Sequence, residues 1–305
     1  MISFSFSGHE TFSLRHGWLK KGVDGVSQKP DLFTTEDAMI RLGVGRNMVQ
    51  SVRYWCLATR VLKDAEKRGE LVPTDLGKSI FLDGDLDPFL EDSATLWLLH
   101  WHLATNLSHS TTWFWMFNYC THAEFNKEKI AFEIQSWLER QGHKKPVSEN
   151  TLRRDIDCFL RTYVSSRQIK TTVSEDSLDC PLTDLHLITE LDDSKNYQFN
   201  RGSQDSLPDE IFVYALAEFW QMKDRPESIA LSKMMSEAGS PALVFKLDEN
   251  SIVQRLEKIE TISAGAFAYD ETAGLKQIYR RGEIDLNGLL EKCYRKKTKK
   301  AGAAK

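Results

Sequence analysis

Apolar positions recur at helical spacing on either side of a glycine-bearing turn near the N-terminus. Before the turn, Thr34 and Asp37 resemble a capping box that opens a helix, and the apolar positions of that helix end at Gly43. After the turn, a second helix is expected to begin at Arg46. Its apolar positions repeat every three or four residues and comprise Val49, Val52, Cys56 and Thr59. Two helices joined in this way predict a helix-turn-helix.

The opposite face of the second helix carries side chains suited to DNA phosphates and base edges. These side chains are Arg46, Asn47, Gln50, Arg53 and Tyr54. Residues 61–81 then read as two short strands around a charged turn, followed by a small helix, which is the layout of a winged helix. We therefore expect residues 1–90 to form a winged-helix-like DNA-binding domain. The alternative is an ordinary helical hairpin that packs a core and binds nothing.

Aromatic residues are concentrated in residues 94–119, where four of the eight tryptophans occur. They are Trp97, Trp101, Trp113 and Trp115. The segment has no interleaved Lys or Arg, which favours buried helices over a surface that stacks on single-stranded bases. An aromatic-rich helical spine is expected here.

Residues 126–164 repeat the two-helix pattern, with Ser148 as the expected N-cap of the second helix. The side chains that could contact DNA lie in the loop and on the polar helix face, namely Lys144, Lys145, Asn150, Arg154 and Arg161. The alternative is a surface ion-pair ladder of Arg153, Asp157 and Arg161 at four-residue spacing. Residues 91–165 are thus expected to hold the spine and a second helix-turn-helix.

The remaining chain is expected to form a linker with short strands (166–206) and a C-terminal helical or winged-helix-like domain with a basic tail (207–305). Within the latter, residues 240–247 read as a strand and residues 271–282 as a helix, while Asp248 should cap a helix. The predicted fold class is mainly α with short β wings. Winged-helix or helix-turn-helix-like units would surround the aromatic spine.

Composition limits the function classes. The 305 residues have a net charge of −4, so the whole surface is not suited to indiscriminate nucleic-acid binding. A local cationic segment lies at the end of the chain and comprises Arg295, Lys296, Lys297, Lys299 and Lys300. Two interpretations of this segment remain open, namely contact with DNA phosphates and a solvated chain end. Neither a membrane span nor a signal peptide is recognisable, which favours a cytoplasmic protein. The five cysteines are dispersed and lack CxxC spacing, so reduced thiols are expected.

Known motifs for nucleotide hydrolysis, dinucleotide binding, and serine or zinc hydrolysis are missing from the sequence. The candidate catalytic residues are His9, Glu10 and Arg15, which bring a base, a carboxylate and a phosphate-binding cation into one short segment. Metal-assisted phosphodiester cleavage with Mg²⁺ or Mn²⁺ would need such groups, although one carboxylate is few for a two-metal site. In the alternative, Glu10 pairs with Arg15 and His9 bonds a buried backbone group.

Several long segments together resemble a known bacterial family. They are residues 5–24 (SFSGHETFSLRHGWLKKGVD), 42–55 (LGVGRNMVQSVRYW), 73–77 (PTDLG) and 86–101 (LDPFLEDSATLWLLHW), with looser likeness at 179–188 and 245–251. They resemble the domain-of-unknown-function family 4007, which is encoded beside sulfotransferase-like or ATP-pyrophosphatase-like proteins and includes SspB-like proteins of DNA phosphorothioation systems. The resemblance covers most of the chain.

The resemblance implies a part in replacing a non-bridging phosphate oxygen of DNA by sulfur, a modification used in defence against foreign DNA. SspB-like proteins are expected to nick DNA for this purpose. The implied partners are double-stranded DNA, a cysteine desulfurase, an ATP pyrophosphatase or sulfotransferase-like protein, and an ATPase. A homodimer is a further candidate, and no membrane is implied.

The resemblance does not assign catalytic residues to this sequence. Two other hypotheses therefore remain. One is a non-catalytic DNA-binding adaptor or transcription regulator, and the other is a scaffold that docks the sulfur-transfer enzymes.

Overall fold

The computed structural model describes residues 3–82, 86–165, 180–191, 195–223 and 226–302, with side chains as far as Arg295. The described chain is mainly helical with small antiparallel sheets, so the coarse fold class is confirmed. It divides into two compact units. The first contains residues 1–116 and 120–200, and the second contains residues 117–119 and 201–305.

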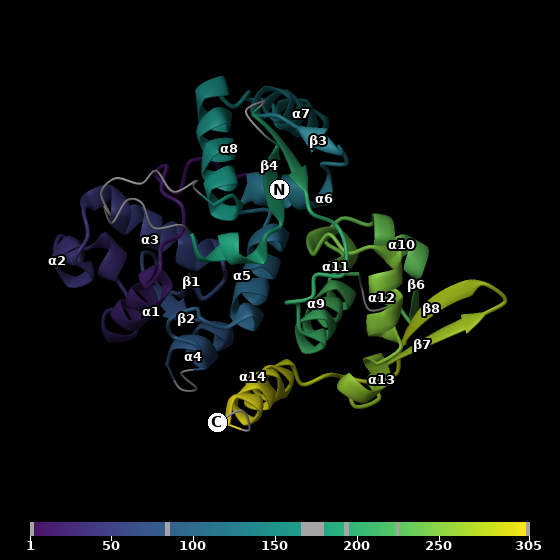
Figure 1. The fold of residues 1–305 in the computed structure, drawn as a ribbon. Coiled ribbons are helices and arrows are strands. Elements are labelled where there is room, and N and C mark those ends of the chain that lie inside the picture. Colours follow the sequence, from purple (N-terminus) through teal and green to yellow (C-terminus); the bar gives the residue numbers. More distant parts are fainter. Residues whose placement is uncertain (1–2, 83–85, 166–179, 192–194, 224–225, 303–305) are drawn as a thin grey trace. The chain divides into compact units, whose positions relative to one another are not determined.

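The N-terminal part of the first unit contains helices on both sides of the predicted turn (Figure 1). Its elements are α1 (Trp18–Gln28), the 3-10 helix η1 (Leu32–Thr34), α2 (Ala38–Leu42) and α3 (Arg46–Ala58). The turn is as expected, since Gly43 ends α2 in the left-handed conformation with φ 64° and α3 begins at Arg46. The predicted capping box is wrong. Thr34 ends η1 instead of opening a helix, and the Asp37 carboxylate binds Lys29 and Arg41.

A short hairpin and a small helix follow α3. β1 (Leu62–Asp64) pairs antiparallel with β2 (Leu71–Pro73), and α4 (Asp75–Phe81) begins after Thr74, whose hydroxyl accepts from the Gly77 N–H at 3.1 Å. The predicted strand pair and helix are therefore confirmed as elements. Gly77 packs directly on the backbone of Val61.

The aromatic segment forms two helices, α5 (Ser93–Thr105) and α6 (Thr111–Asn118). Three of its tryptophans, Trp97, Trp101 and Trp113, have no exposed surface. Asp92 caps α5 by accepting from the Ala94 N–H. The aromatic residues of this segment are therefore mostly core, as the lack of interleaved cations predicts.

The second predicted helix pair is also present, as α7 (Lys127–Arg140) and α8 (Glu149–Tyr163), and Ser148 caps α8. The alternative ion-pair ladder is wrong. Arg153 pairs with Glu149, and Asp157 pairs with Lys127. The first unit is completed by the 3-10 helix η3 (Pro181–Leu185) and a sheet of order β3-β5-β4, with strands at Glu124–Phe125, Asn196–Phe199 and Ile188–Leu191.

The second unit combines helices with a three-stranded sheet of order β6-β8-β7. Its helices are α9 (Asp209–Gln221), α10 (Leu231–Ser236), α11 (Pro241–Val244), α12 (Glu249–Leu256), α13 (Ile259–Ile262) and α14 (Leu286–Gly302). Its strands are β6 (Ser228–Ala230), β7 (Phe267–Thr272) and β8 (Leu275–Arg280). Asp248 caps α12 as expected. The cationic side chains of residues 296–300 lie outside the described side chains.

Two secondary-structure predictions in this unit are wrong. Residues 240–247 contain α11 rather than a strand, because the Ser240 hydroxyl accepts from the Leu243 N–H and Pro241 occupies the first helical position. Residues 271–282 form the end of the β7–β8 hairpin rather than a helix. Ala273 and Gly274 have φ 53° and 78°, as a two-residue hairpin turn requires. This hairpin extends away from the helices of the unit (Figure 1).

The cysteines are free and buried, as expected for reduced thiols. Burial raises the pKa of the Cys56 thiol, and it does the same for Cys158. In the described part of the chain, no helix has the length and apolar character needed to cross a membrane.

Replacing Gly77 by Ala should destabilise the first unit by about 1–3 kcal/mol. A Cβ at this position would lie 2.1 Å from the Val61 carbonyl oxygen, so the backbone of α4 or of Val61 must move. Thermal unfolding of the full chain measures the loss. Gly45→Ala is the matched control, because its Cβ would meet no atom within 4 Å and its φ is −68°. Equal loss in both variants would contradict the packing described for α4.

Candidate functional site

Residues 5–12 form a strained turn at the surface of the first unit. Ser7, Glu10 and Thr11 have φ values of 60°, 49° and 68°. A left-handed conformation is costly for such residues, most of all for the β-branched Thr11. Residues held in this way commonly occur at functional sites. The turn holds the predicted residues His9 and Glu10.

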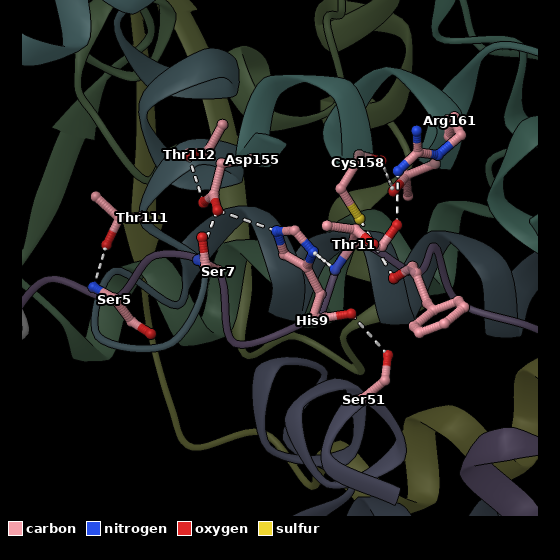
Figure 2. Close-up of polar contacts among 12 residues, drawn as sticks. Ser5, Ser7, His9, Thr11, Ser51, Thr111, Thr112, Asp155, Cys158 and Arg161 are labelled. Atoms are coloured by element: carbon pink, nitrogen blue, oxygen red, sulfur yellow. Dashed lines mark hydrogen bonds and ion pairs between the residues drawn. The ribbon is translucent and has the colours of Figure 1, made fainter. Parts of the chain in front are cut away.

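A buried histidine–aspartate pair holds this turn from inside (Figure 2). His9 has no exposed surface, and its Nε2 lies 3.0 Å from Oδ1 of Asp155 on α8. The Thr11 backbone N–H donates to Nδ1 of His9 at 3.0 Å. Since Nδ1 accepts, Nε2 carries the proton and donates it to Asp155. Both ring nitrogens are therefore engaged.

The Asp155 carboxylate receives two more protein donors. The Ser7 backbone N–H donates to Oδ1 at 2.6 Å, and the Thr112 hydroxyl donates to Oδ2 at 3.0 Å. Asp155 is 1% exposed, and burying a carboxylate without hydrogen-bond donors costs free energy. The carboxylate therefore needs these donors. Asp155 thereby joins α8, α6 and the turn.

Helices α3 and α8 both hold the backbone of the turn. From α3, the Ser51 hydroxyl donates to the His9 carbonyl at 3.0 Å, and the Trp55 indole N–H donates to the Phe12 carbonyl at 3.1 Å. From α8, the Cys158 thiol donates to the same Phe12 carbonyl at 3.3 Å, and Arg161 Nη2 donates to the Thr11 carbonyl at 2.6 Å. The structure thus brings both predicted DNA-facing helices to one turn.

Aromatic rings close the interior around His9. Tyr54 and Trp113 meet the imidazole edge-on, with centroid distances of 5.6 and 5.8 Å. A Cβ on Gly8 would lie 2.5 Å from the Tyr54 ring, so a glycine is needed where the turn passes over it. Burial raises the pKa of the Tyr54 hydroxyl well above its ordinary value. Tyr54 therefore belongs to the core and not to the exposed face on which it was expected.

The other predicted DNA-facing residues remain accessible. Arg53 is half-buried and its guanidinium lies 3.9 Å from Asp64. The exposed residues are Arg46, Asn47 and Gln50 on α3, Lys144 and Lys145 in the loop, and Asn150, Arg154 and Arg161 on α8. Cationic and amide side chains thus line the surface on both helices that hold the turn.

Comparison with known proteins shows the family. A family model described as a protein of unknown function (DUF4007) matches residues 6–294. The chain belongs to this family. No match was found among curated proteins.

Two solved structures are similar to this member of the DUF4007 family. One is an SspB crystal structure with 30% sequence identity, and the other is a magnesium ion-bound SspB crystal structure with 31%. In both cases the TM-score is 0.83, and the similarity covers 95% of this chain and 88% of the other. The expected SspB-like character is confirmed.

The catalytic candidates differ in what they can contact. Glu10 is exposed, whereas His9 is enclosed with both nitrogens bonded. The bond from the Thr11 N–H is a backbone contact of the kind expected in the structural alternative, although Thr11 itself is exposed. Arg15 is half-buried, and its guanidinium lies over the rings of Phe12 and Trp18, 5.4 Å from each centroid. Glu10 is thus the accessible carboxylate of the turn, and His9 holds the turn from the interior of the unit.

The expected Mg²⁺ or Mn²⁺ remains a prediction, and the residues around the turn do not by themselves indicate a site for it. The described residues contain no group of three or more His, Cys, Asp or Glu side chains that could hold an ion. Asp155, the carboxylate nearest His9, directs its oxygens at three protein donors. No catalytic step is therefore assigned to a metal in this DUF4007 protein.

Sequence reasoning missed Asp155, Ser51 and Thr112. A signal was available for Asp155, because it interrupts the apolar stripe of α8 between Leu152 and Phe159. A carboxylate at a buried helical position needs partners from elsewhere in the fold. Those partners are 43 and 146 residues away in sequence, so no local pattern identifies them.

Replacing Asp155 by Ala should lower the free energy of unfolding by about 3–5 kcal/mol. The variant leaves the His9 N–H, the Ser7 N–H and the Thr112 hydroxyl without their acceptor. Asp157→Ala, on the same helix, is the matched control. The side chain of Asp157, which pairs with Lys127, is 39% exposed. The expected loss in free energy of unfolding is therefore below about 1 kcal/mol. Chemical denaturation distinguishes the two, and similar losses would refute the role given to Asp155.

Proposed function

We propose that this protein is the DNA-binding component of a bacterial DNA phosphorothioation system, acting in the cytoplasm. Membership of the DUF4007 family and similarity to SspB structures support the system. The observation that carries DNA binding is the convergence of α3 and α8, both with exposed cations, on the strained turn. Its proposed partners are the cysteine desulfurase, the ATP pyrophosphatase or sulfotransferase-like protein, and the ATPase of the system.

In this proposal α3 lies in the major groove. Arg46, Asn47 and Gln50 are exposed within the first five residues of the helix, the part from which recognition helices contact bases. The β1–β2 hairpin acts as a wing, with exposed Lys63 and Arg68 near the phosphates. A duplex is favoured over a single strand because the aromatic rings of the spine are mostly buried.

The second helix pair extends the contact along the duplex. Arg154 is exposed on α8, and Lys144 and Lys145 are exposed in the loop that precedes it. Arg161 bonds the Thr11 carbonyl and is still exposed, so it can also approach a phosphate beside the turn. Phosphate contacts of this kind fix the position of a duplex without reading its sequence.

Strand nicking is the catalytic part of the proposal, with Glu10 as its accessible base. Glu10 would take a proton from a water whose oxygen forms a new bond to phosphorus. The bond from phosphorus to one deoxyribose oxygen would break, and that oxygen would leave with a proton from solvent. Arg15 and Arg161 would offset charge on the phosphate. His9 acts as a positioning residue, because it holds the turn without reaching its surface.

A non-catalytic adaptor is the second candidate. The observation that favours it is that both ring nitrogens of His9 are engaged within the protein. It predicts DNA binding without any change in DNA topology.

Arg46→Ala and Arg154→Ala should each weaken binding of the full chain to a short duplex, roughly fivefold or more. Each should also reduce by about one the magnitude of the slope of the logarithm of the binding constant against the logarithm of the salt concentration. Gel retardation or fluorescence anisotropy at several salt concentrations measures both effects. Lys233→Ala removes the same charge from an exposed position in the second unit and is the control. Binding that is unchanged in the two arginine variants would refute the assignment.

Incubation with supercoiled plasmid should produce open circles if the protein nicks DNA. The reaction is run without divalent ions, with Mg²⁺ and with Mn²⁺, since the residues alone do not indicate a metal. Glu10→Gln should retain DNA affinity and lose at least about tenfold in nicking rate. Open circles formed equally by Glu10→Gln would exclude Glu10 as the base. Retardation without open circles under any condition favours the adaptor.

A further inference from the structure

The loop between α5 and α6 is fixed against the end of α3. The side-chain amide of Asn106 donates to the carbonyls of Leu57 and Ala58, at 3.1 and 3.0 Å, and is itself buried. Arg60, just after α3, donates from Nη2 to the Thr105 carbonyl at 3.0 Å. The last carbonyls of α3 are thus capped by a loop from the aromatic spine. This places residues 106–110 beside the recognition helix of the proposed DNA site.

Charged and titratable side chains gather at this junction. Arg53 comes from α3, Arg60 follows the helix, Asp64 lies on β1, and His109 lies in the loop. The Arg53 guanidinium lies 3.9 Å from Asp64, which is 73% exposed in its side chain. A separation of 3.9 Å is longer than a hydrogen bond, so the pair is a loose surface contact. Arg53 thus lies beside one weakly held carboxylate, while the other guanidinium nitrogen of Arg60, Nη1, lies 3.5 Å from Nδ1 of the buried His102.

His109 is half-buried, and its Nδ1 lies 3.1 Å from the Ser108 hydroxyl. Burial lowers the pKa of His109 below its ordinary value of 6.5, with smaller contributions from Arg53 and Arg60, while Asp64 acts in the opposite direction. His109 lies in the loop that Asn106 and Arg60 fix against the end of α3, and Arg53, Arg60 and Asp64 all contribute to the shift of its pKa. Near neutral pH the imidazole is therefore largely uncharged in the free protein.

We propose that Arg53, Arg60 and His109 form a second phosphate-binding cluster, which holds the DNA backbone beside α3 and takes up a proton when DNA binds. The proposal rests on the proposed DNA binding and adds a site to it. Arg46, Gln50 and Arg53 follow each other at four- and three-residue spacing, so they share one face of α3. Arg53 lies seven residues after Arg46, or about 10 Å along the helix at about 1.5 Å per residue. The cluster therefore extends this face toward the end of α3.

The sign of the pH effect follows from the charges around His109. A phosphate at the cluster stabilises the imidazolium form and raises the pKa of His109 on binding. DNA affinity should therefore rise as pH falls through the pKa of the bound state, and level off below the pKa of the free state. Uptake of one proton gives at most about a tenfold change in affinity per pH unit. Asp64 repels the phosphate, so its removal should tighten binding.

The test is the affinity of the full chain for a fluorescent duplex between about pH 5.5 and about pH 8, at constant ionic strength. Wild-type protein is compared with His109→Gln, Asp64→Asn and the control His186→Gln, an exposed histidine in the same unit. His109→Gln should retain binding at high pH and lose several-fold of the gain at low pH. Asp64→Asn should bind about two- to fivefold more tightly at every pH at which the wild type binds.

The outcomes separate this proposal from the DNA-binding proposal. If the duplex does not bind at any pH, both fail. If the duplex binds and Arg46→Ala weakens it, but His109→Gln has the wild-type pH profile, only the second phosphate cluster is refuted. Weaker or unchanged binding by Asp64→Asn also counts against it, because a purely structural role of Asp64 gives no gain in affinity. An NMR titration of His109 with and without the duplex should show the pKa rise directly.

Discussion

The hydrogen bond between His9 and Asp155 is the interaction on which the proposed site depends. It lies in the interior, where both side chains are almost completely enclosed, and joins residues 146 positions apart. In such surroundings a carboxylate is stable only with several donors, and the imidazole, the Ser7 amide and the Thr112 hydroxyl together provide them. The second imidazole nitrogen is equally committed, since it accepts from Thr11. Each contact restricts the others, so the turn has one arrangement that satisfies all of them.

This restriction explains how two helices far apart in sequence can act on one ligand. Residues 5–12 are bonded to α3 through Ser51 and Trp55, and to α8 through Cys158 and Arg161. The interior contacts offset the conformational cost of the left-handed residues and keep Glu10 at the surface. The exposed cations of α3 and α8 thus belong to two helices that are both bonded to a carboxylate-bearing turn. Such preorganisation is what a surface needs in order to hold a phosphodiester in a defined position.

Local chemistry in the sequence predicts much of the fold. The start of α3 after Gly43, the caps Ser148 and Asp248, and the buried aromatic spine follow from short-range rules of capping and periodicity. Wrong predictions arose where turn chemistry was overlooked, as at Ser240–Pro241 and at the Ala273–Gly274 turn. The site was predictable only in part. His9 and Glu10 were recognisable as residue types, but the partners of His9 come from α8 and from the backbone of the turn itself. The core position of Tyr54 likewise depends on Trp113, from a distant helix.

The most direct test of this account is hydrogen exchange of the full chain, measured by mass spectrometry with and without a duplex. If the turn held by His9 and Asp155 is the centre of a DNA-binding surface, DNA should slow exchange together in residues 5–12, in the N-terminal half of α3 and in the loop before α8. These three segments are far apart in sequence, and in the structure α3 and α8 are joined through the turn. Protection confined to one helix, with unchanged exchange in residues 5–12, would contradict the account.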